Sequence, residues 1–123
     1  IAPHPDRRMS RWTIHKFGGT SLAGPAEFHR AAEILHGGEG RRAAVVSASA
    51  GVTDRLLSLL RPAGPDPDSV LETLWSHHES LARELLSEEG AEGYLEALAT
   101  DQETIRSVLD ALKLLGSTPA EAE

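Results

Sequence analysis

The chain has 123 residues, of which 40% are hydrophobic and 25% charged, and it contains no cysteine. This is the length of one small domain or of part of a larger one. Without cysteine there is no disulfide framework, no cysteine-based zinc site and no thiol nucleophile. No apolar run approaches the ~18 residues of a membrane span, and no secretory signal begins the chain. We therefore expect a cytoplasmic protein without a membrane partner.

Charge is unevenly distributed along the chain. The formal net charge of −7 argues against nucleic acid as the main partner. Residues 1–61 hold nine basic and five acidic side chains, a net charge of +4, whereas residues 62–123 hold three basic and fourteen acidic ones, a net charge of −11. The basic half is the part suited to an anion, and the acidic half is typical of solvated amphipathic helices.

Strands and helices are predicted to alternate in the first half. Residues 1–10 lack any apolar period, and we expect a flexible leader there. Residues 12–17 and 43–47 predict strands, and the apolar residues on both faces of the first favour a covered strand. Helical patterns follow at 25–36 and 56–60. This order is typical of a parallel α/β sheet.

The second half predicts helices alone. Residues 61–68 contain three prolines and are expected to form a loop. A capping box from Ser69 to Glu72 predicts the start of a helix whose leucine stripe, continuing to residue 85, we expect to pack in a core.

Two glycines interrupt the helical pattern that follows. Gly90 and Gly93 predict a break, after which short apolar stripes indicate separate helices at 94–98 and 100–115. Thr118 marks the expected start of one more helix.

The most informative segment is Lys16-Phe-Gly-Gly-Thr-Ser21, at the end of the first predicted strand. Gly18 and Gly19 allow backbone N–H groups to approach an anion closely, because no Cβ intervenes. Lys16 adds a point charge suited to phosphate. The lysine precedes the loop, which excludes a Walker A motif. The alternative is an ordinary turn between a strand and a helix.

A second polar loop follows the second predicted strand. In a parallel sheet it lies at the same carboxyl edge as the glycine loop, where open α/β sheets bind ligands. Ser47, Ser49 and Thr53 are therefore candidates for hydrogen bonds to a polar substrate. The alternative is that they close the turn and that Thr53 or Asp54 caps the following helix.

Together, Lys16-Phe-Gly-Gly-Thr-Ser21 and Val45-Val-Ser-Ala-Ser-Ala-Gly-Val-Thr53 resemble the N-terminal part of aspartokinases, in the amino-acid kinase superfamily. The resemblance covers about residues 11–121 and is greatest to kinases fused to homoserine dehydrogenase. It implies the N-terminal part of a three-layer α/β/α sandwich with a mainly parallel sheet and a helical insertion at 69–115. Residues 11–123 would then be an incomplete portion of a catalytic domain.

The resemblance implies transfer of the γ-phosphoryl group of ATP, with Mg²⁺, to the side-chain carboxylate of L-aspartate. The product, 4-phospho-L-aspartate, leads to lysine, threonine and methionine. In that reaction Lys16 would neutralise charge on the transferred phosphoryl group. Gly18 and Gly19 would bind phosphate oxygens through the backbone, and Thr20 and Ser21 would line the same site.

On the acceptor side, the resemblance implies that Ser47 and Thr53 contact aspartate. Aspartokinases carry a Gly-Glu motif shortly after the helical stretch and an Arg-Gly-Gly-Ser-Asp motif further along, and this sequence stops short of both positions. We therefore expect the chain to be inactive by itself, and the full-length parent to be a homo-oligomer. No metal site is predicted among its own side chains.

Two alternatives stay open at this point. One is a related kinase that acts on another amino acid or on carbamate. The other is a non-catalytic helical module, built around residues 69–115, that binds a partner protein. In either case two strands make a marginal sheet, so we expect the isolated chain to be poorly folded or oligomeric.

Overall fold

The computed structural model describes residues 11–116, which divide after Asp54 into two compact units that are described separately. The expected leader at 1–10 and the helix start at Thr118 lie outside the described residues. The first unit contains β1 (Trp12–Phe17), the 3-10 helix η1 (Gly19–Leu22), α1 (Pro25–His36) and β2 (Arg41–Val46). It also contains the start of α2 (Val52–Ser58), whose remaining residues belong to the second unit.

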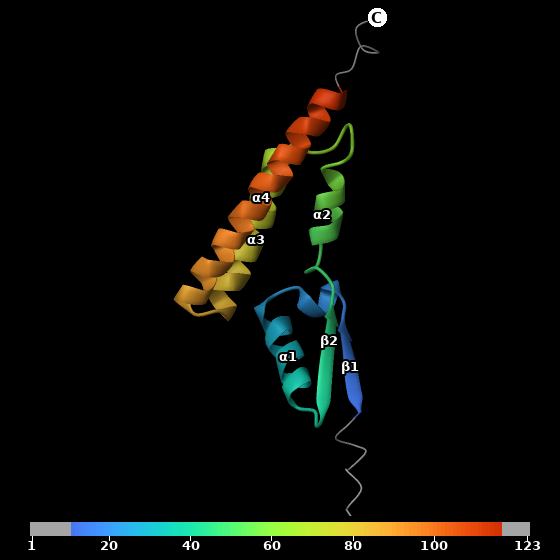
Figure 1. The fold of residues 1–123 in the computed structure, drawn as a ribbon, viewed down its shortest axis with the longest axis vertical. Coiled ribbons are helices and arrows are strands. Elements are labelled where there is room, and N and C mark those ends of the chain that lie inside the picture. Colours follow the sequence, from blue (N-terminus) through green and yellow to red (C-terminus); the bar gives the residue numbers. More distant parts are fainter. Residues whose placement is uncertain (1–10, 117–123) are drawn as a thin grey trace, which may run out of the picture. The chain divides into compact units, whose positions relative to one another are not determined.

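β1 and β2 form a two-stranded parallel sheet (Figure 1). Trp12 lies opposite Arg41 and Phe17 lies opposite Val46, so the two strands pair residue by residue without a bulge. The Ser47 amide donates to the Phe17 carbonyl at 3.0 Å and extends the pairing by one residue. The predicted strand–helix–strand order and the parallel sheet are thereby confirmed.

α1 covers one face of this sheet (Figure 1). Gly24 is its N-cap, proline occupies the first helical position and Gly37 ends it, as the sequence predicts. Phe17, Leu22 and Ala31 form the buried cluster between the sheet and the helix. A hydrophobic core of this size is small, and it holds the end of β1 against η1 and α1.

The opposite face of the sheet is open in the described part of the unit. Trp12, Ile14 and Val45 share this face by strand alternation and register, and they are 59%, 69% and 56% exposed. The expectation that β1 is covered on both faces is therefore wrong for the described residues. The physical reason is that the one helix joining two parallel strands covers a single face.

The second unit is a helical hairpin of α3 (Pro67–Leu85) and α4 (Glu88–Gly116), which lie side by side (Figure 1). Leu71, Leu74 and Leu81 of α3 are buried, as are Ala91 and Leu95 of α4. The expected core packing of the leucine stripe is confirmed. None of the helices in the described range has both the length and the apolar character that crossing a membrane requires.

The helix starts differ from those predicted. α3 begins at Pro67, and the Asp66 carboxylate accepts the Ser69 amide at 3.3 Å, so the N-cap is Asp66 and Ser69 lies inside the helix. Proline is favoured at the first helical position, which explains why the helix starts inside the proline-rich segment. α2 begins at Val52, so Thr53 also lies inside a helix and does not cap one.

α4 runs without a break through both glycines, contrary to the prediction. Ser87 accepts the Gly90 amide at 3.1 Å through its side chain and the Ala91 amide at 2.8 Å through its carbonyl, which satisfies the first turn. An interior glycine costs a helix ~1 kcal/mol relative to alanine. Burial of Ala91 and Leu95 against α3 outweighs that cost.

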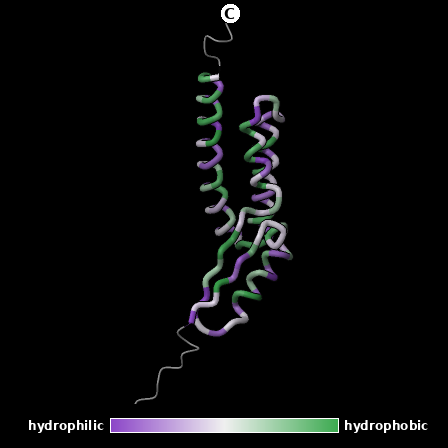
Figure 2. The backbone as a smooth tube through the Cα atoms, turned by 90° about the vertical axis from the view of Figure 1, so that its right-hand side faces the viewer, coloured by the Kyte–Doolittle hydropathy of each residue, from purple (hydrophilic) through white to green (hydrophobic). Residues whose placement is uncertain are grey.

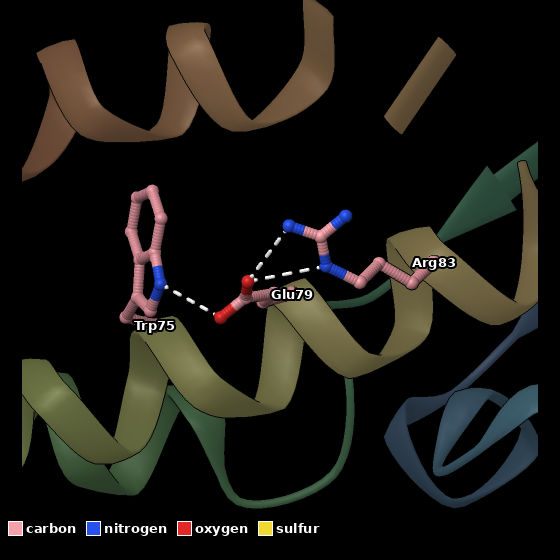
Figure 3. Close-up of polar contacts among 3 residues, drawn as sticks. All are labelled: Trp75, Glu79 and Arg83. Carbon is pink, nitrogen blue, oxygen red and sulfur yellow. Dashed lines mark hydrogen bonds and ion pairs between the residues drawn. The ribbon is translucent and has the colours of Figure 1, made fainter. Parts of the chain in front are cut away.

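The polar side of α3 carries a three-residue network (Figure 3). Glu79 accepts a hydrogen bond from the Trp75 indole at 3.0 Å and is paired with Arg83 at 3.0 Å, each partner lying four residues away. The spacing places all three on one side of the helix. This network is part of the helix surface and leaves no unpaired charge on Glu79 for a ligand.

Candidate functional site

The glycine loop begins where β1 ends and turns at once into η1. Gly18 is the N-cap of η1 and has an extended backbone, and its carbonyl accepts the Ser21 amide at 3.1 Å. The short helix thus directs the residues after Lys16 across the carboxyl edge of the sheet. The second loop leaves β2 at the same edge, because the two strands are parallel.

The two loops touch each other. A Cβ added to Gly19 would lie 3.2 Å from the Ala48 carbonyl oxygen and 3.6 Å from the Ala50 Cα. The buried Ser49 hydroxyl donates to the Leu22 carbonyl at 2.5 Å, which links residues 27 positions apart. The predicted meeting of the loops at one edge is confirmed, and the close approach favours glycine at position 19.

A hollow of about 470 Å³ lies beside the glycine loop, within the first unit. This volume falls in the range of ~300–1,000 Å³ that small-molecule sites occupy. The residues that line it come from the end of β1, from η1 and from one side of α1, and they are Lys16, Phe17, Thr20, Ser21, Glu27, Arg30, Ala31 and Ile34.

Three of the predicted phosphate-site residues border this hollow, namely Lys16, Thr20 and Ser21, and all three side chains are exposed. Gly18 and Gly19 lie in the same loop between them. The predicted cation and hydroxyl groups are thus brought together around one space. A cation, hydroxyl donors and a tight glycine turn are groups that bind phosphate oxygens.

The predicted acceptor-side residues lie outside the hollow. Ser47 is exposed directly after β2, and Thr53 is exposed in the first turn of α2. Ser49 is turned inward to the Leu22 carbonyl, so its hydroxyl serves the contact between the loops. Gly51 has a φ of 80°, a left-handed conformation that favours glycine and that turns the chain into α2.

Sequence reasoning missed two charged residues of the hollow. Glu27 and Arg30 lie three residues apart on α1, on the side of the helix that also carries Ile34. Periodicity does identify α1, but the charged residues on its surface look like any solvated face. Only the docking of α1 against β1 shows that these two border the same space as Lys16.

Comparisons with known proteins show which proteins the chain is similar to. No family model matches the chain. A bifunctional aspartokinase/homoserine dehydrogenase 1 of Zea mays is 33% identical over 109 residues, and enzyme 2 of Arabidopsis thaliana is 33% identical over the same length. Each alignment covers 85% of this chain and 12% of the relative.

Comparison with solved structures also finds aspartokinases. Two structures of E. coli aspartokinase III, one with lysine and aspartate and one with aspartate and ADP, match with TM-scores of 0.50 and 0.53. Both are 27% identical over 83% of this chain. The chain is homologous to aspartokinases. Its fold is accordingly that of part of an amino-acid kinase.

The chain spans only 12% of the plant relatives and 21% of the aspartokinase III chain. By their names, these relatives are kinases, a class of transferase. The plant relatives are named as chloroplastic. The cytoplasmic location expected for this chain stays a prediction.

Proposed function

We propose that this chain supplies part of the active site of an aspartate kinase, which transfers the γ-phosphoryl group of ATP, with Mg²⁺, to the side-chain carboxylate of L-aspartate. The observation that carries the proposal is the contact between the glycine loop and the second polar loop at one edge of a parallel sheet. That edge is where open α/β sheets bind ligands.

The chemistry needs few protein groups. A carboxylate with a pKa of ~4 is already ionised at neutral pH, so no general base is required. Phosphoryl transfer depends mainly on positioning and on neutralising charge. Lys16 and the backbone amides of Gly18 and Gly19 fill these roles on the phosphate side, with Thr20 and Ser21 beside them.

The acceptor side is assigned to the second loop. Ser47 and Thr53 are exposed on either side of the inward-facing Ser49, so their hydroxyls are available to hold aspartate. The names of the solved neighbours, which include aspartate and ADP, support this pairing of a nucleotide side and an aspartate side. The remaining ligands would come from the rest of a kinase.

The test is a chimera in which residues 11–116 replace the matching N-terminal segment of E. coli aspartokinase III. We expect ADP formation that requires both L-aspartate and Mg²⁺. Lys16→Ala should lower kcat by ~10²-fold or more, as removal of one stabilising charge does elsewhere. Ser47→Ala and Thr53→Ala should raise KM for aspartate more than KM for ATP.

The matched control is Arg41→Gln, which removes a cation at the far end of β2. Its kcat should equal that of the unaltered chimera. A chimera that is folded by circular dichroism but forms no aspartate-dependent ADP would contradict the proposal. Turnover with another amino acid or with carbamate in place of aspartate would favour the related kinases instead.

A further inference from the structure

The hollow beside the glycine loop is bordered by two cations from different elements. Lys16 comes from the end of β1, and Arg30 comes from the second turn of α1. Both side chains are exposed. In the described part of the chain, neither Lys16 nor Arg30 forms an ion pair with a carboxylate.

Glu27 is the acidic residue that lines the hollow, and its place at the start of α1 explains why a carboxylate is found there. Glu27 lies in the first turn of α1, and its carboxylate oxygen is 3.1 Å from where a Cβ of Gly24, the N-cap, would be. A carboxylate at this place is stabilised by the unpaired amides and the dipole of the helix N-terminus. Glu27 therefore has a structural reason to be there that does not involve Arg30.

We propose that Arg30 is a second phosphate-binding residue, which holds the phosphate chain of the nucleotide together with Lys16. This inference rests on the proposed function, because it assigns the phosphate end of ATP to the hollow. A phosphate chain carries several negative charges, and one lysine neutralises only one of them. A guanidinium binds two phosphate oxygens at once, whereas an ammonium acts as a point charge.

The arrangement also suits a phosphate better than the carboxylate of aspartate. Thr20 and Ser21, which also line the hollow, offer hydroxyl donors. Phe17 and Ala31, which also line the hollow, are apolar and buried. Apolar surface beside a cation reduces the screening of its attraction to an anion.

The experiment is calorimetric titration of the whole chain with inorganic tripolyphosphate and, separately, with ATP and Mg²⁺. Arg30→Gln should weaken the binding of both probes by about tenfold or more, the size expected for loss of a hydrogen-bonded charge. Arg30→Lys should recover part of the loss. The control Arg41→Gln changes net charge equally but lies at the other end of the sheet, and its affinity should equal that of the unaltered chain.

A fourth variant reverses the sign of the effect. Glu27→Gln removes the carboxylate of the hollow and should tighten the binding of metal-free tripolyphosphate. Added salt should weaken tripolyphosphate binding to the unaltered chain more than to Arg30→Gln. The variant has one cation fewer at the hollow, so salt has less attraction to screen. A looser complex of tripolyphosphate with Glu27→Gln would overturn the proposal.

The outcomes separate this inference from the proposed function. If Lys16→Ala loses binding while Arg30→Gln retains it, Arg30 has no phosphate role and the kinase proposal stands. If Arg30→Gln loses binding while the chimera forms no ADP, the anion site stands and the kinase proposal fails. If the unaltered chain is folded by circular dichroism and binds neither probe, the phosphate role of the hollow is overturned for both.

Discussion

Gly19 is the residue at which the two loops are closest. Its missing side chain leaves room for the Ala48 carbonyl, and a Cβ there would approach that oxygen to 3.2 Å. The neighbouring Gly18 has no atom within 4 Å of its Cβ position and an extended backbone that any residue adopts. The fold therefore leaves room for a side chain at position 18 but not at position 19 without a shift of the neighbouring loop.

Gly19→Ala should therefore destabilise the chain, and Gly18→Ala should not. The added methyl group must push the two loops apart by a few tenths of an ångström, a strain of about 1 kcal/mol. Denaturant unfolding of both variants measures the difference. Equal midpoints for the two variants would show that the loops are not in contact.

His77 is the residue from which a pH dependence of stability is expected. Partial burial lowers its pKa below the ordinary value of 6.5, and the nearby His78 and Arg55 lower it further. Between the lowered pKa and 6.5 the unfolded chain binds more protons than the folded chain. Stability is therefore complete above this window and falls as the pH decreases through it.

The expected effect of His77 is small because the ring is only half-buried. His77→Gln should flatten the dependence of the unfolding midpoint on pH between about pH 7 and about pH 5. Thermal unfolding monitored by circular dichroism at both pH values tests this. An unchanged dependence in the variant would assign the effect to other groups.

Residues differ in how far the sequence reveals their roles. Lys16 and the glycines after it form one continuous motif, and their position at the end of a strand follows from local pattern alone. Arg30 is separated from Lys16 by a 3-10 helix and a turn. Its place beside the hollow depends on the packing of α1 on Phe17, which no local pattern encodes.

Among the elements, α3 shows how a start signal is misread. The segment from Ser69 to Glu72 fits a capping box, but the Asp66 side chain is the group that accepts the Ser69 amide. Both residues fit the preference for an N-cap, and the sequence alone does not rank them. The favourable proline directly after Asp66 decides for the earlier start.

Asp66→Ala should consequently destabilise the helical unit by about 1 kcal/mol, the usual value of an N-cap. Ser69→Ala should have an effect within about 0.5 kcal/mol, since its side chain lies inside the first turn. Chemical denaturation followed by the helical circular dichroism signal compares them. A larger loss in Ser69→Ala than in Asp66→Ala would place the cap at Ser69.

α4 illustrates a different failure of local reasoning. Its two glycines are common signs of a break, yet the helix continues to Gly116 because Ala91 and Leu95 pack on α3. Arg106 pairs with Asp68 near the start of α3, and several apolar residues of α4 beyond Arg106 are exposed. Figure 2 shows hydrophobic residues recurring along this helix toward its end. Val108 and Leu112 are exposed.

At the scale of the whole molecule, uncovered apolar surface is the main feature. The open sheet face exposes Trp12, Ile14 and Val45, and the end of α4 exposes Leu112 and others. Exposed apolar residues in contiguous sets promote association. This pattern supports the expectation that the isolated chain is oligomeric or poorly folded, which stays a prediction.

Sedimentation velocity and thermal unfolding of the isolated chain test that expectation. We expect concentration-dependent association or a broad transition, because a two-stranded sheet with one helix buries little apolar surface. Replacement of Ile14 by Thr, which keeps β propensity, should reduce association. A monomer with a sharp cooperative transition would contradict this prediction.

The hydrogen bond from Ser49 to the Leu22 carbonyl ties the two loops of the candidate site together. It fastens the end of η1 to the middle of the second loop, with Gly51 turning the chain just beyond. The position of the glycine loop is therefore coupled to that of the second loop by a side-chain hydrogen bond as well as by the pairing of β1 with β2. Removal of this hydroxyl would leave the strands paired but would loosen the attachment of one loop to the other.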